Sequence, residues 1–151
     1  PFIAHWPKKI SPGTRSDLLT THVDLMATAA EIAETEVPIK SDGISILPTL
    51  LGKPQKIKHD FIYFEIYEGP FQQSVRVGDW KGYRRGLKDP VELYDLSKDP
   101  SEKRNIAEQH PDIAQNLTGI LGNQHGPRPH FTAPTHFTNR ARKRKRKENG
   151  M

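Results

Sequence analysis

Four polar or basic side chains on two neighbouring strand-like segments are the first candidates for chemistry in this 151-residue sequence: Gln73, Arg76, Lys81 and Arg84. Guanidinium and ammonium groups hold anions through charge-assisted hydrogen bonds, so such a set can meet an anionic or sugar substrate. The competing interpretation for each residue is a solvated strand face, and the sequence favours it for any one of them taken singly.

The nucleophilic and metal-binding side chains exclude several kinds of site. Cysteine is absent, which excludes disulfides, cysteine-ligated zinc and thiol catalysis within the chain. The seven histidines are His5, His22, His59, His110, His125, His130 and His136. No pair of them has the close spacing of a local metal site. His22 stands at the start of a predicted helix, where it can face a pocket or simply belong to the cap region.

A second group of chemically able side chains comprises Tyr94, Asp95, Asp99 and Asn105. Each also has an ordinary structural role. Asp99 can cap a helix, Tyr94 can pack within a sheet and Asn105 can bond a loop. We therefore interpret this group as structural.

Positive charge is concentrated at the C-terminal end. Seven of the eight residues from 140 to 147 are basic, whereas residues 1–139 are close to neutral despite a formal net charge of +5 for the whole chain. Such a run can bind polyanions such as nucleic acid, sulfated glycans or acidic lipids. No aromatic side chain interrupts it, so base stacking is not expected there. The default interpretation is a solubilising, disordered end.

The first third of the chain predicts one strand and one helix. Residues 2–6 are typical of a short buried strand that ends at Pro7. The helix begins after Thr21, its predicted cap, carries Asp24 in its first turn and ends near Glu34. Its apolar residues form two stripes, so we expect the helix to bury two sides.

The remainder predicts a small sheet and two helices. Aromatic and branched residues indicate strands at 61–66, 74–77, 80–84 and 92–96, with a hairpin at the Gly78-Asp79 turn. Strands this close together favour an antiparallel meander. One helix is predicted from Asp99 through Ala107 and another from Pro111 to Gly122. The predicted core positions of the last helix are Ile113, Leu117, Ile120 and Leu121. No stretch approaches the roughly 18 apolar residues of a membrane span.

Four stretches, in order, resemble the type I sulfatase (arylsulfatase) family of the alkaline phosphatase superfamily, as a C-terminal fragment. They are PFIAHWP at 1–7, HVDL at 22–25 running on to DGISILP at 42–48, SVRVGDWK at 74–81, and ELYDL at 92–96 followed by Asp99-Pro100, Glu102, Asn105 and Ala107. The fourth is the most specific. Ala27 departs from the family pattern, which commonly has proline there, and Gly82 stands where a larger residue is usual.

The resemblance implies an α/β parent fold with a large mixed sheet between helices. Residues 1–56 would be the last strand and helix of that large domain. Residues 57–122 would form a small α+β C-terminal subdomain, a four-stranded antiparallel sheet with a packed helix, and residues 123–151 a disordered basic tail. Because the first segment would lack the sheet on which it packs, we expect the isolated chain to fold poorly or only in part.

The resemblance also implies chemistry that this chain cannot supply alone. Family members hydrolyse sulfate esters with a formylglycine made from the Cys or Ser of a Cys/Ser-x-Pro-x-Arg motif, assisted by a calcium ion. That motif is absent here, Ser11-Pro12 has the wrong spacing, and Asp42-Gly43 is an isolated turn. We assign no catalytic or metal residue and expect the chain to be inactive without a missing N-terminal catalytic portion.

The sequence therefore predicts the C-terminal portion of a sulfuric-ester hydrolase acting on a sulfated sugar or aryl sulfate. It would support the fold and contribute to the substrate-pocket rim, for which the candidates are His22, Gln73, Arg76, Lys81 and Arg84. The resemblance implies a periplasmic, extracellular or lysosomal location. Two alternatives remain open: a polyanion-binding module acting through the basic tail, and a related phosphoester hydrolase.

Overall fold

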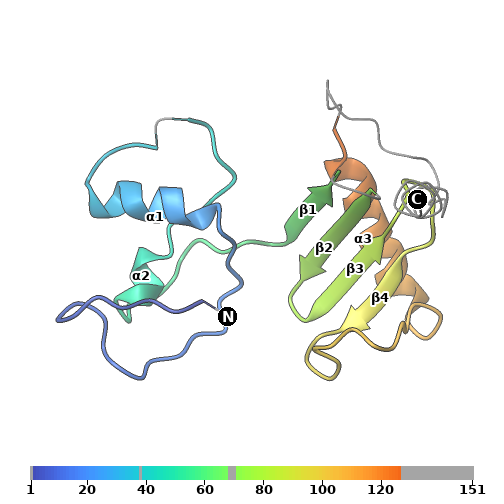
Figure 1. Cartoon of the computed structure of the whole chain (residues 1–151), viewed down its shortest axis with the longest axis horizontal. Helices are drawn as coiled ribbons and strands as arrows, with labels where there is room; N and C mark the ends of the chain where they lie inside the picture. The colour runs from blue at the N-terminus through green and yellow to red at the C-terminus, as the bar shows by residue number, and fades with distance from the viewer. Residues whose placement is uncertain (1, 38, 68–70, 127–151) are drawn as a thin grey trace, which may run out of the picture. The chain divides into compact units, whose positions relative to one another are not determined.

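The computed structural model describes residues 2–37, 39–67 and 71–126. The chain divides into two compact units between Ile62 and Tyr63, at the start of the first strand. Each unit is described by itself, and Figure 1 follows the chain through both. The greater part of the predicted tail, from residue 127 onward, lies outside the described residues, and residues 123 and 124 belong to the last helix.

Unit 1, the N-terminal unit, holds two helices, α1 (Asp24–Ile32) and α2 (Leu47–Leu50), joined by long loops. The strand predicted at residues 2–6 does not form. A strand needs a neighbour for its backbone N–H and C=O groups, and the described residues place none beside this segment. A turn follows it instead, in which the Trp6 carbonyl accepts hydrogen bonds from the backbone N–H groups of Lys9 and Ile10.

Helix α1 confirms the predicted helix but differs at its ends. The Thr21 side chain does not cap it; the Asp24 carboxylate accepts a hydrogen bond from the Thr21 backbone N–H instead. The helix ends at Ile32, followed by Glu34 in the left-handed region at a φ of 53°. The expected burial of two sides is not met among the described residues of unit 1. Leu25, at 50% exposed, and Met26, at 45%, lie open to solvent.

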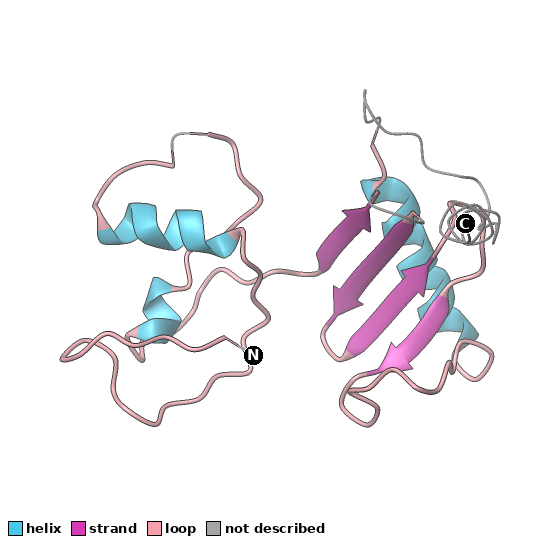
Figure 2. Cartoon of the chain, viewed as in Figure 1, coloured by secondary structure: helices cyan, strands magenta, loops and turns pink. Residues whose placement is uncertain are grey.

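Unit 2, the C-terminal unit, is built on an antiparallel sheet with the order β1-β2-β3-β4. The strands are β1 (Ile62–Ile66), β2 (Gln72–Val77), β3 (Trp80–Arg84) and β4 (Glu92–Asp95). All four predicted strands are confirmed, with ends shifted by at most two residues. Helix α3 (Pro111–Gln124) lies behind the sheet and contacts β2 and β3 (Figure 2).

The core of unit 2 lies between the sheet and α3. Its centre is formed by the buried side chains of Val75, Leu93, Leu117 and Leu121. A Cβ atom at Gly82 would lie 3.1 Å from the Leu117 Cβ atom, so a larger residue there would require its neighbours to shift by a few tenths of an ångström. This close packing favours the glycine that interrupts β3.

The helix predicted from Asp99 through Ala107 does not form, and its residues make a loop fastened to β4. The Asp99 carboxylate accepts hydrogen bonds from the backbone N–H groups of Lys103 and Arg104, and Glu102 has a left-handed φ of 53°. Side-chain bonds to nearby N–H groups compete with the helical pattern. The Asn105 amide oxygen accepts the Leu93 N–H, which confirms its predicted structural role.

Candidate functional site

The four candidate residues of unit 2 fall on opposite faces of the sheet. Gln73 lies opposite Arg84 in the β2–β3 register, and Arg76 lies opposite Lys81. Because side chains alternate along a strand, these two pairs point to opposite faces. The Gln73 side chain donates to the carbonyl of Leu121 in α3, which identifies its face as the one covered by the helix. The structure therefore places Gln73 beside Arg84 on one face of the sheet and Arg76 beside Lys81 on the other.

On the face away from α3, Lys81 is paired with a carboxylate and Arg76 is exposed. The Lys81 ammonium lies 2.7 Å from both carboxylate oxygens of Glu102, so its charge is already matched. Arg76 is exposed, and its Nε donates to the Gly78 carbonyl at 2.9 Å. Of this pair, Arg76 offers the more available cationic group to an external anion.

The fifth candidate, His22, lies in unit 1 just before α1. Its side chain is exposed, and its Nδ1 lies 3.4 Å from the Thr21 hydroxyl. A pocket of about 380 Å³ does occur in unit 1, but His22 does not line it. The pocket is lined by Ser16, Asp17, Leu18, Leu19, Thr49, Gln55, Lys58 and His59. The histidine that borders it, His59, was not singled out by the sequence.

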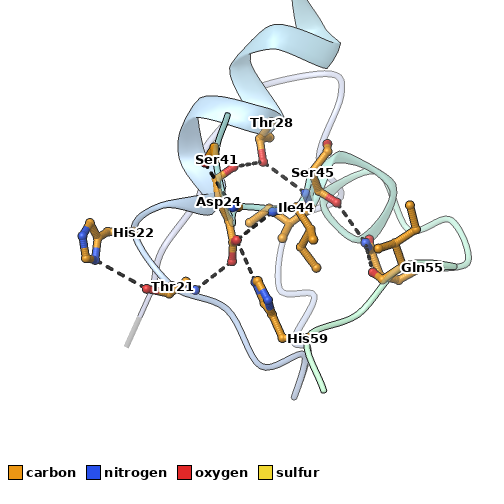
Figure 3. A network of polar contacts seen from close by, with 12 residues as sticks. Thr21, His22, Asp24, Thr28, Ser41, Ile44, Ser45, Gln55 and His59 are labelled. Atoms are coloured by element: carbon orange, nitrogen blue, oxygen red, sulfur yellow. Dashed lines mark hydrogen bonds and ion pairs between the residues drawn. The ribbon is translucent and has the colours of Figure 1, made fainter. Parts of the chain in front are cut away.

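His59 reaches this pocket as part of a buried hydrogen-bond network, drawn in Figure 3. The Asp24 side chain is fully buried, and its Oδ1 lies 2.8 Å from Nε2 of His59. The same carboxylate accepts the backbone N–H groups of Thr21 and Ile44. One carboxylate thus joins the start of α1 to two later segments of the chain. At Gly43, beside Ile44, an added Cβ would lie 2.2 Å from the Val23 carbonyl oxygen, so this approach requires glycine.

A second buried network occupies unit 2 at the C-terminal end of α3. The Glu65 side chain, 4% exposed, accepts hydrogen bonds from the Tyr63 and Tyr67 hydroxyls and lies 2.6 Å from Nδ1 of His125. Gln73, fully buried, donates to Glu65 at 2.9 Å. On its other side, the Gln73 amide oxygen accepts a 2.6 Å hydrogen bond from Nε of Arg84. No local pattern predicts the pairing of Glu65 with His125, since 60 residues separate them.

The ionisation of this network follows from its contacts. Burial raises the pKa of Glu65, but hydrogen bonds from Tyr63, His125, Tyr67 and Gln73 together outweigh burial and hold that pKa below its ordinary 4.5. Burial also raises the pKa of Tyr63, and its bond to the Glu65 carboxylate raises it further. Glu65 is therefore an anion at neutral pH, and the Tyr63 hydroxyl remains a donor.

The described residues do not fit the calcium site that the sulfatase resemblance implies. Among them, no three His, Cys, Asp or Glu side chains come together in a way that could hold a metal ion. The carboxylates of the two buried networks are occupied by protein donors instead.

No described helix is both long enough and apolar enough to cross a membrane.

Comparison with known proteins connects the fold to one family. The family model described as "N-sulphoglucosamine sulphohydrolase, C-terminal" matches residues 1–125. An N-acetylgalactosamine-6-O-sulfatase from Bacteroides thetaiotaomicron is 30% identical over 80% of this chain and 26% of its own length. Arylsulfatase A from Bos taurus is 29% identical over 76% of this chain and 27% of its own length. The chain thus spans about a quarter of the length of these relatives.

A solved structure extends the comparison to three dimensions. It is a complex of a protein with its substrate, D-glucosamine-2-N,6-O-disulfate. It superposes on this chain with a TM-score of 0.67 and 27% sequence identity, covering 78% of this chain and 26% of the other. The arrangement of helices and strands described above is therefore found in a larger protein.

Proposed function

Because this chain belongs to the sulfatase family, we propose that it is the C-terminal portion of a sulfuric-ester hydrolase. The match of the C-terminal family model to residues 1–125 carries this proposal. The sequence contains no cysteine and no Ser-x-Pro-x-Arg motif, so the formylglycine nucleophile would come from another part of the enzyme. Calcium would be bound there as well, where it would polarise the sulfate group. The chain alone would be inactive.

The proposed role of unit 1 is to dock on the rest of the enzyme. Three exposed apolar side chains of α1, Leu25, Met26 and Ile32, support this role, because a helix with bare apolar residues gains stability when another surface covers them. Relatives are about four times longer than the matched segment. The remaining polypeptide is thus large enough to provide the covering surface.

The proposed role of unit 2 is to support the fold and form part of the substrate-pocket rim. Arg76 is the rim candidate with the most available charge, and His22 of unit 1 is a second exposed candidate. Lys81, held by Glu102, would act at the rim only by exchanging that partner. The relatives named above act on sulfated sugars or carry the name arylsulfatase. We propose the same substrate class here, and a periplasmic, extracellular or lysosomal location.

Restoring the upstream sequence tests this function. Expressed with the coding sequence upstream of Pro1, up to and including a Cys/Ser-x-Pro-x-Arg motif, the protein should hydrolyse an aryl sulfate, whereas residues 1–151 alone should not. Activity on an aryl phosphate without activity on any sulfate ester would instead identify a phosphoester hydrolase. Turnover of an aryl sulfate by residues 1–151 alone would contradict the assignment of the nucleophile to another segment.

The basic run at residues 140–147 favours a second function, polyanion binding. Seven clustered cations release condensed counterions when they bind a polyanion, so binding should weaken steeply as salt rises. Deleting residues 140–151 should abolish retention on a sulfated glycan column and leave the aryl sulfate activity of the restored enzyme unchanged. Retention that survives the deletion would place polyanion binding elsewhere in the chain.

A further inference from the structure

A chain of buried hydrogen bonds holds the Arg84 side chain in one orientation. Only 6% of the residue is exposed, and its Nε donates to the Gln73 amide oxygen at 2.6 Å. The Gln73 amide nitrogen in turn is fixed by the Tyr63 hydroxyl, at 2.7 Å, and by Glu65. Because a guanidinium is planar, fixing Nε fixes the direction of its two terminal nitrogens.

Those two terminal nitrogens have unused hydrogen-bonding capacity. Within residues 2–37, 39–67 and 71–126, no acceptor bonds to either Nη atom of Arg84. The same part of the chain contains no fully enclosed side-chain nitrogen or oxygen without a partner. Neither Nη atom is therefore fully enclosed, and their N–H groups, which have no acceptor among these residues, have capacity to bond an external one.

The charges around Arg84 leave its cation available. Burial lowers the pKa of Arg84, while nearby Tyr63, Asp89 and Glu65 raise it, and an arginine remains protonated at neutral pH in either case. The Glu65 carboxylate is occupied by Tyr63, Tyr67, Gln73 and His125. The nearby Asp89 carboxylate repels an incoming anion, and this repulsion limits the affinity of Arg84 for that anion.

We propose that Arg84 binds an external oxyanion, a carboxylate or sulfate group, through its two terminal nitrogens. A guanidinium whose Nε is held by the protein presents its two terminal nitrogens as donors to two oxygens of such a group. Burial of the arginine strengthens the interaction, because the effective dielectric constant is lower than in water. The site lies wholly within unit 2 and needs none of the residues that would hydrolyse the ester. The binding proposal can therefore be tested independently of the proposed enzyme activity.

A site-specific titration tests the proposal, because the basic tail would dominate any measurement of total anion binding. In ¹⁵N-labelled protein whose unit 2 amide signals are dispersed as in a folded sheet, the Arg84 Nε–Hε signal is followed during additions of sodium sulfate or sodium acetate. Sodium chloride at equal ionic strength is the reference. We expect a saturable shift with one or both oxyanions beyond that of chloride. A response to sulfate alone would identify a sulfate group as the ligand, and a response to acetate alone a carboxylate.

The neighbouring arginine provides a matched control. Arg85 is exposed, and its guanidinium lies 5.9 Å from the centre of the Tyr83 ring. Arg84→Lys keeps the positive charge but loses the two terminal guanidinium nitrogens. It should weaken oxyanion binding at least tenfold, as followed at the Gln73 side-chain amide signal. Arg85→Lys should leave oxyanion binding unchanged. A wild-type Arg84 signal that responds equally to sulfate, acetate and chloride overturns the proposal, and this titration decides it even if Arg84→Lys fails to fold.

Discussion

Replacing Asp24 with alanine should unfold unit 1 more readily than any other single change of a polar side chain there. The carboxylate is fully buried, pairs with His59 at 2.8 Å and accepts the backbone N–H groups of Thr21 and Ile44. Removing this carboxylate leaves three donors without their acceptor, and each donor that stays buried costs about 1–3 kcal/mol. The start of α1 would also lose its tie to the segment around Ile44.

Amide hydrogen exchange can measure this loss in unit 1. The informative amide is Ile46, because its N–H bonds to the Thr28 hydroxyl and is not itself a partner of Asp24. Asp24→Ala should lower the protection of Ile46 by roughly 100-fold or more, since each 1.36 kcal/mol corresponds to about a factor of ten. Asp17→Ala, which removes an exposed carboxylate seven residues earlier, should leave protection unchanged. Full protection of Ile46 in Asp24→Ala would show that the network does not hold unit 1 together.

Replacing Glu65 with leucine should have the corresponding effect in unit 2. The substitution leaves the hydroxyls of Tyr63 and Tyr67, the Gln73 amide and His125 without their common acceptor at a nearly buried position. We expect unit 2 to lose several kcal/mol of unfolding free energy, because each buried donor left without an acceptor costs about 1–3 kcal/mol. Glu65→Gln, which keeps the shape and one acceptor oxygen, should cost less, and the difference between the two variants measures the part due to the missing acceptor and altered packing.

The pH dependence of unit 2 should carry the same signature. Because the folded protein holds the pKa of Glu65 below its ordinary 4.5, ionisation of Glu65 stabilises the folded state fully at pH values above that number. This contribution is lost as the pH falls through the lowered pKa of the folded state. Below pH 4.5 the wild type should therefore lose stability more steeply than Glu65→Gln, which has no proton to gain at this position.

Tryptophan fluorescence can report on unit 2 alone, since the chain has one tryptophan in each unit. With Trp6→Phe as the background, Trp80 emission during urea unfolding follows the sheet of unit 2. Glu108→Gln removes an exposed carboxylate and is the control for general charge effects. Equal unfolding midpoints for Glu65→Leu and the background protein, or parallel acid profiles for Glu65→Gln and the background protein, would contradict the role given to this network.

The successes and failures of sequence-based prediction separate along physical lines. Strands β2 and β3 and helix α3 follow from residue patterns and turn residues within short windows, and these local signals were sufficient. The helix predicted from Asp99 failed because the carboxylate at Asp99 bonds two nearby N–H groups in place of a helical pattern. The strand predicted at residues 2–6 failed because pairing depends on a neighbour, which no local pattern can report.

The sequence by itself determined the family and the four-stranded sheet with its packed helix, through motifs whose order and composition can be read directly. It also identified Arg84 as a group able to hold an anion. Only the tertiary structure decided which sheet face that side chain occupies, and that Gln73 holds it there. It alone joined Glu65 to His125. These facts depend on strand register and on contacts between distant segments, and a one-residue change of register would turn every strand side chain to the other face.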